Sequence, residues 1–137
     1  MPARGEEALL RISNFVVLIG DREYGFAEVG PLTSATDSEA ADGRRDHGHR
    51  FAPVVLRRAL TIGTELYEWR RAIVAGKKDR RDVTIRQLSA PGGRVVNSWR
   101  LVGAWPSRWS GPSFNAQAND IAMEELELTY DDLLWGG

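Results

Sequence analysis

Residues 121–130, with the sequence Ile-Ala-Met-Glu-Glu-Leu-Glu-Leu-Thr-Tyr, alternate between two sets of side chains. The first set contains Ile121, Met123, Glu125, Glu127 and Thr129, and the second contains Ala122, Glu124, Leu126, Leu128 and Tyr130. A period of two residues places successive side chains on opposite faces of a strand. The segment therefore predicts a half-buried strand with one packed face and one wet face, and Glu125 and Glu127 lie on the wet face.

Runs of β-branched and aromatic residues predict further strands before this one. They cover residues 14–19, 24–29, 54–61, 83–88 and 95–105, and residues 32–39 extend the second run. Gly20-Asp21 is a turn that makes a hairpin of the first two strands, and Pro91-Gly92-Gly93 is a turn between the last two. Pro106 is expected to end the strand before it, which leaves residues 107–119 as a loop.

One segment carries a helical pattern. Leu66, Trp69 and Ile73 form an apolar stripe at helical spacing, Gly63-Thr64 can cap its start, and Gly76 can end it. The predicted fold class is therefore mainly β with one short α-helix, in a single domain over residues 1–137. Residues 1–12 are expected to form an N-terminal arm, and the polar, glycine-containing residues 40–53 an exposed loop.

The composition of the chain excludes some kinds of site and gives no reason to expect some kinds of partner. The chain has 137 residues, a formal net charge of -1 and no cysteine, which excludes disulfides and cysteine metal sites. The near-neutral charge gives no reason to expect nucleic acid or an anionic membrane as a partner. The N-terminus lacks the apolar stretch of a signal peptide, so we expect synthesis in the bacterial cytoplasm without membrane insertion.

Few residues are arranged as in a known catalytic or metal-binding site. The cluster Asp46-His47-Gly48-His49 could bind a metal, and a metal-binding enzyme centred on His47 and His49 is one hypothesis. The spacing matches no established zinc motif, so solvated histidines are the favoured interpretation. No serine elbow or phosphate-binding loop is present, and the acidic residues near the C-terminus are divided between two strand faces. We therefore expect no enzyme activity, no catalytic or metal site and no cofactor.

The order of several motifs resembles the tail-tube family of contractile phages and extracellular contractile injection systems. The resemblance is carried by Asn14-Phe15-Val16-Val17, Gly25-Phe26-Ala27-Glu28-Val29-Gly30-Pro31-Leu32, Leu56-Arg57-Arg58-Ala59-Leu60-Thr61, Glu65-Leu66-Tyr67-Glu68-Trp69-Arg70, the connector 76–82, the block 104–116 and the final strand. The block 104–116, which begins with Ala104-Trp105-Pro106 and ends with Phe114-Asn115-Ala116, is the most specific. Two places depart from the family pattern: the loop 37–53, and Gly103, where the resemblance implies asparagine.

The resemblance implies a β-barrel or sandwich subunit that forms hexameric rings, which stack into a tube inside a contractile sheath. The partners would be copies of the chain, the sheath protein, baseplate or hub proteins and protein cargo in the lumen. The wet face of the final strand would then line the lumen. A tube initiator or baseplate hub adaptor of the same machine is the alternative.

Two sets of residues are candidates for contacts in such an assembly. The exposed loop suggests an inter-ring contact made by Arg44, Arg45, His47, His49 and Arg50. Five tryptophans are present, and Trp69, Trp99 and Trp105 are expected in the core. Trp109 and Trp135 stand among polar residues and are candidates for subunit contacts, where aromatic residues concentrate binding energy. Arg80 and Arg81, in the charged connector, are the other candidates for subunit contacts.

Overall fold

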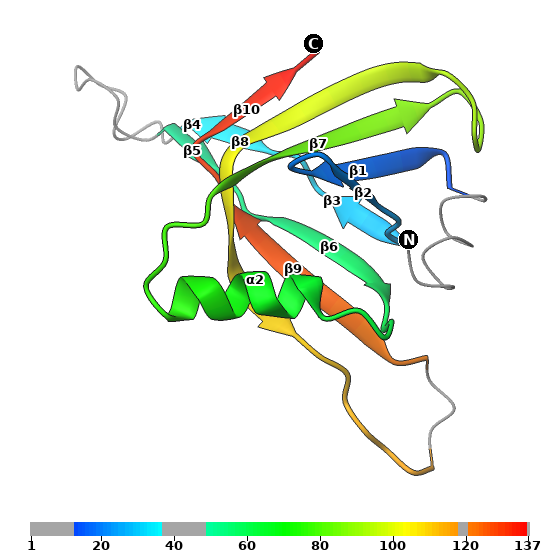
Figure 1. Ribbon diagram of the computed structural model, residues 1–137. Helices are drawn as coiled ribbons and strands as arrows, with labels where there is room; N and C mark the ends of the chain where they lie inside the picture. Colours follow the sequence, from blue (N-terminus) through cyan, green and yellow to red (C-terminus); the bar gives the residue numbers. More distant parts are fainter. Residues whose placement is uncertain (1–12, 37–48, 118–120, 137) are drawn as a thin grey trace.

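A computed structural model of the chain describes residues 13–36, 49–117 and 121–136. This part of the chain is mainly β with one helix, which confirms the predicted fold class (Figure 1). Its elements are β1 (Phe15–Ile19), β2 (Arg22–Tyr24), β3 (Glu28–Gly30), β4 (Ser34–Thr36), β5 (His49–Phe51), β6 (Val54–Ala59), α2 (Glu65–Val74), β7 (Arg81–Leu88), β8 (Val95–Ser110), β9 (Met123–Thr129) and β10 (Asp132–Trp135). No helix among these residues is both long enough and apolar enough to cross a membrane.

The longest strand, β8, belongs to two groups of strands. Its first part pairs with β7 and β10, and its last part pairs with β9. In Figure 1, β8 turns downwards from the upper group, which contains β1, β7 and β10, to the lower group with β6 and β9. The sheet runs in the order β2-β1-β7-β8-β9-β6-β3, and β4 pairs with β5 separately. The main sheet is open, because no pairing within the described residues joins β2 to β3.

A β-bulge at Gly103 lets β8 turn. Leu101 pairs with Val83 and Ala104 pairs with Arg81, so β8 contains one residue more than β7 over this stretch. Gly103 has φ +64°, a left-handed conformation that glycine adopts without a steric penalty. The extra residue changes which side chains face inwards: Leu101 and Ala104 are both buried.

The core lies between the two strand groups and is completed by α2. The alternation predicted for residues 121–130 is confirmed in β9, where Glu124, Leu126 and Leu128 are buried and the residues between them are half-buried. The helix contributes Leu66 and Trp69 to the same core. Its ends also agree with prediction, since Thr64 is the N-cap and the left-handed Gly76 follows the C-cap Ala75.

The prediction that Pro106 ends the long strand is wrong. β8 continues to Ser110, and Pro106 pairs with Leu128 of β9. The Pro106 carbonyl accepts a hydrogen bond of 3.1 Å from Arg70 of α2. The nitrogen and carbonyl of a strand residue point to the same side, so the missing N–H of Pro106 faces the helix rather than the β8–β9 ladder. Residues 107–110 are therefore strand and not loop.

Other corrections follow from pairings that are distant in sequence. The predicted strand 24–29 divides, because Tyr24 ends β2 while Glu28 begins β3, which pairs with β6. Residues 49–51 form β5, although they lie in the predicted loop, because β4 offers them a partner. The strand β10 was not predicted. Trp105 lies outside the buried core cluster, since the bulge at Gly103 moves it off the inward face, whereas Trp69 and Trp99 pack as predicted.

Candidate assembly surfaces

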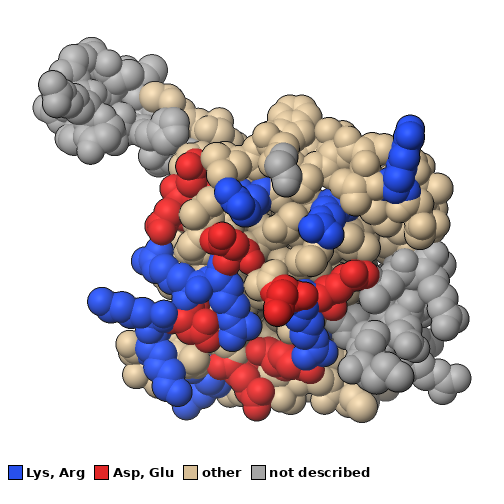
Figure 2. Space-filling model, turned by 45° about the horizontal axis from the view of Figure 1, so that its top comes forward, with Lys and Arg blue, Asp and Glu red and all other residues tan. Residues whose placement is uncertain are grey.

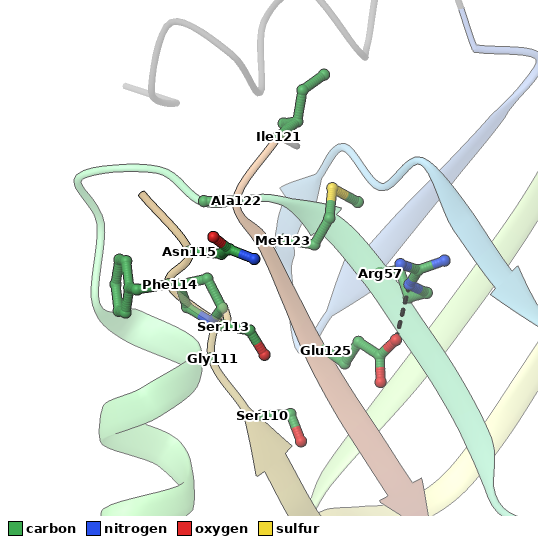
Figure 3. Close-up of a pocket in the computed structure, with 11 residues that line it drawn as sticks. Arg57, Ser110, Gly111, Ser113, Phe114, Asn115, Ile121, Ala122, Met123 and Glu125 are labelled. Carbon is green, nitrogen blue, oxygen red and sulfur yellow. Dashed lines mark ion pairs between the residues drawn. The ribbon is translucent and has the colours of Figure 1, made fainter. Parts of the chain in front are cut away.

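The half-buried face of the lower strands carries a ladder of alternating charges, which we call the charged ladder (Glu28, Arg57, Arg108, Glu125 and Glu127). Arg57 Nε lies 2.7 Å from Glu125 Oε1, and Arg57 Nη1 lies 3.4 Å from Glu28 Oε2. Arg108 Nε donates to Glu127 Oε2 at 3.2 Å. Figure 3 shows the Arg57–Glu125 pair beside the hollow near the end of β6 and the start of β9. These charges largely neutralise one another, so the face is polar without a strong field of one sign.

The opposite face of the same strands buries an ion pair. Arg58 Nε donates to Glu124 Oε1 at 2.9 Å, and the two side chains are 1% and 2% exposed. Trp109 Nε1 donates to the second carboxylate oxygen of Glu124 at 2.7 Å. The guanidinium of Arg58 lies 5.7 Å from the ring centres of Tyr24 and Phe26. A charge in such a place needs its partner, because removing one leaves the other buried and uncompensated.

Sequence reasoning missed this pair, although a signal was present. Arg58 shares its strand face with Val54 and Leu56, and Glu124 shares its face with Leu126 and Leu128. Two opposite charges on the apolar faces of two strands suggest a buried pair. The register that places Arg58 directly opposite Glu124 comes only from the structure.

The predicted subunit contacts Trp109 and Trp135 lie far apart in the fold. Trp109 packs against the core, and its ring meets that of Tyr67 edge-on at 4.9 Å. Trp135 is 73% exposed and stacks on Trp99, with 5.4 Å between ring centres. Its indole N–H also donates to Asn97 Oδ1 at 3.2 Å. Of the two tryptophans, Trp135 presents the larger free surface, and its role in assembly stays a prediction.

Arg80 and Arg81 both have partners within the chain. Arg80 Nη1 lies 3.0 Å from each carboxylate oxygen of Asp131. Arg81 donates two hydrogen bonds to Asp79, and these bonds hold the pKa of the Asp79 carboxyl below its ordinary value. The Arg81 guanidinium also lies over the ring of Trp69, at 4.7 Å. In Figure 2 acidic and basic side chains intermingle over one part of the surface, so this face carries no patch of a single sign.

The backbone at Gly103 has no room for a side chain. An added Cβ at Gly103 would lie 2.6 Å from Asp131 Oδ2, the carboxylate that holds Arg80. The carboxylate of Asp131 occupies the space beside the Gly103 backbone, and glycine has no side chain that would clash with it.

We expect Gly103→Ala to lower the free energy of unfolding by about 1–2 kcal/mol, because alanine in the left-handed region is strained and its Cβ displaces Asp131. Chemical denaturation followed by circular dichroism measures the change. Gly92→Ala is the matched control, since Gly92 has φ +73° and no atom within 4 Å of an added Cβ. A loss no larger than that of the control would show that the contact with Asp131 contributes nothing.

The segment between β8 and β9 projects from the lower end of the fold (Figure 1). We call residues 111–117 the arm. Its Phe114 is 88% exposed, and Ile121, after the arm, is 75% exposed. The arm borders the hollow drawn in Figure 3, which has a volume of about 530 Å³. Large exposed apolar side chains on a projecting segment are typical of a surface that contacts another molecule.

The predicted inter-ring residues fall mostly outside the described part of the chain. Arg44, Arg45 and His47 lie outside the described residues, so their part in an inter-ring contact stays a prediction. His49 and Arg50 belong to β5, opposite Thr36 and Ala35 of β4. Across residues 13–36, 49–117 and 121–136, no group of three acidic or histidine side chains could hold a metal ion.

Comparison with known proteins identifies the family. The family model of the T4-like virus tail tube protein gp19 matches residues 12–134. No curated protein sequence matched the chain. Three solved structures illustrate the likeness of fold, and all are less than 25% identical to the chain.

A chain of the sheath–tube complex of the extracellular contractile injection system PVC, in its extended state, has a TM-score of 0.72 and 24% identity, with 90% of this chain and 88% of that chain covered. A chain of the tube-terminating cap of the anti-feeding prophage has a TM-score of 0.69 and 22% identity, with 90% and 87% covered. Hcp1 from Flavobacterium johnsoniae has a TM-score of 0.64 and 18% identity, with 90% and 94% covered. Since the family model spans nearly the whole sequence, the chain belongs to the T4-like virus tail tube protein family.

Proposed function

We propose that this tail tube protein forms hexameric rings that stack into the inner tube of a contractile injection particle. The family match over residues 12–134 carries the proposal. Its role is structural rather than catalytic: the rigid tube is a conduit, and contraction of a surrounding sheath drives it through a target envelope. The chain would be made in the bacterial cytoplasm and act as part of an assembled particle outside the cell.

The open sheet supports ring formation. Within the described residues, β3 pairs with β6 on one side and ends the sheet on the other. A strand at the end of a sheet has backbone groups that can pair with another chain. Cyclic symmetry turns such a contact into a closed ring, because an edge of each copy meets a different surface of the next. We therefore place the unpaired side of β3 at the contact between neighbours in a ring.

The charged ladder suits the lumen of the tube. Glu125 and Glu127 were expected there from sequence, and their carboxylates are paired with Arg57 and Arg108. A hydrated lining of paired charges would hold protein cargo weakly, because neither sign dominates over a long distance. The remaining partners in this proposal are the sheath protein and the baseplate or hub proteins.

Native mass spectrometry of the purified chain tests the proposal. A subunit has a mass of 15.3 kDa, so we expect species of six subunits and multiples of six. Single hexamers that never stack would favour the tube initiator or hub adaptor, the alternative implied by the sequence resemblance. Monomers at all concentrations would contradict both forms of the proposal.

A further inference from the structure

An apolar cleft opens where the upper strands diverge from β3. It has a volume of about 270 Å³ and is lined by the apolar residues Phe15, Val29, Leu32, Ile85 and Trp99, and by the polar residues Asn14 and Gln87. We call it the aromatic cleft. Trp135 stands beside it, stacked on Trp99. A cavity of about 150 Å³ is enough to hold a benzene ring, so this cleft has room for one aromatic side chain.

Polar contacts hold the cleft in shape. Trp135 Nε1 donates to Asn97 Oδ1, and Asn97 Nδ2 donates to Gln87 Oε1 at 2.9 Å. Gln87 is itself a lining residue of the cleft. Since these bonds already fix the exposed indole of Trp135, an incoming group would meet an ordered aromatic surface and lose little entropy on binding.

The arm offers a side chain of the right kind. Phe114 is 88% exposed, and no ring contact covers it among the described aromatic pairs. The arm, Gly-Pro-Ser-Phe-Asn-Ala-Gln, contains no charged residue. The lining of the aromatic cleft contains none either, although charged residues make up 27% of the chain. The two surfaces therefore match in polarity, and neither would bury an unpaired charge.

The two surfaces lie in different parts of one copy. Trp99 lies near the start of β8, and the arm follows the end of that strand. The path along β8 from Trp99 to Ser110 is about 36 Å at the usual 3.3 Å per residue, and the strand turns at Gly103 on the way. Figure 1 shows the arm at the lower end of the fold and the start of β8 in the upper group. Different patches at opposite ends of a molecule make a heterologous contact, which repeats from copy to copy.

We propose that Phe114 of one copy inserts into the aromatic cleft of a second copy, beside Trp135. The inference rests on the proposed function, because it describes a contact within the tube. It also assigns a role to Trp135 that agrees with the contact predicted from sequence. The arm is then a connecting element, and the residues of the cleft select an aromatic group.

Disulfide trapping tests this contact. Because the chain has no cysteine of its own, only the introduced cysteines can form a disulfide. Asn115 is next to Phe114 in the arm, and Asn14 is a polar residue of the cleft lining, so cysteines at these two positions leave Phe114 and Trp135 in place. Assembled Asn14→Cys/Asn115→Cys protein is oxidised and separated without reductant. We expect a ladder of dimers, trimers and larger species, since each chain carries both halves of the contact. Either single variant should run as a monomer after the same treatment. Dimers from Asn115→Cys alone would show a symmetric arm-to-arm contact and overturn the proposal, as would assembled tubes that give no ladder.

Substitution gives a second, independent readout. Phe114→Ser should raise the concentration needed for assembly by about tenfold or more, as expected for an aromatic hot spot, while Phe114→Leu should raise it less. Ser113→Leu, which alters the neighbouring exposed residue, is the control for a general effect on the arm. Tubes that form normally from Phe114→Ser would refute the contact and leave the tube function intact. Wild-type protein that never assembles would instead refute the proposed function.

Discussion

Glu124→Leu is expected to lower the free energy of unfolding by about 3–5 kcal/mol, because it leaves the Arg58 guanidinium buried without its carboxylate. Arg58 is 1% exposed and cannot reach bulk water without moving the core around it. The substitution also removes the acceptor of the Trp109 indole N–H. Urea denaturation followed by circular dichroism, at a concentration where the chain is monomeric, measures the loss.

Glu125→Leu is the matched control on the same strand. Its side chain is 30% exposed and pairs with Arg57, so its removal should cost about 1 kcal/mol or less. The double variant Arg58→Met/Glu124→Leu removes both buried charges and should recover most of the stability lost in Glu124→Leu. If Glu124→Leu cost no more than Glu125→Leu, the buried pair would stabilise the fold no more than the exposed pair does.

Trp69→Ala is the second large effect, with an expected loss of about 3–5 kcal/mol from the cavity that it creates. Trp69 is 1% exposed, and its indole N–H donates to the carbonyl of Asp79 at 2.8 Å. It also supports Arg81, whose guanidinium lies over its ring. Removal therefore detaches α2 from the start of β7 as well as opening the core.

Trp135→Ala is the natural comparison, since the same chemical change is made at a residue 73% exposed. We expect it to cost less than about 1 kcal/mol in the monomer. The same variant should impair assembly if the aromatic cleft receives Phe114. Comparable losses of monomer stability from the two tryptophan variants would contradict the placement of Trp69 in the core. Thermal unfolding of both variants provides the measurement.

The elements with strong local signals could be predicted from sequence. The alternation of residues 121–130 predicts β9 together with its buried face, because a strand with one packed face repeats every two residues. The stripe of Leu66 and Trp69 and the glycine at position 76 likewise predict α2 and its end. In both segments the local pattern and the tertiary packing demand the same structure.

The failures occur where a distant contact overrides the local pattern. The bulge at Gly103 reverses which side chains of β8 face inwards. Counting every second residue from Trp99 therefore wrongly predicts that Trp105 faces the core. Pro106 continues a strand because its missing N–H faces α2, which sequence does not reveal. Residues 49–51 become a strand only because β4 pairs with them.

The candidate surfaces were predicted less completely than the fold. Trp135 stood out in the sequence as an exposed aromatic, and the structure leaves it exposed. Phe114 was not singled out, because its loop gave no sign that a single apolar side chain would project from it. The aromatic cleft combines residues from β1, β3, β7 and β8, with Leu32 beyond β3, so no local pattern could have predicted it.

The proposed function requires that this chain assembles into a tube. Negative-stain electron microscopy of the purified wild-type protein, over a series of increasing concentrations, tests it most directly. We predict rings with six-fold symmetry in end views and stacks of rings, or continuous tubes, in side views. Particles that stay monomeric at every concentration, or assemblies without rings, would contradict the claim.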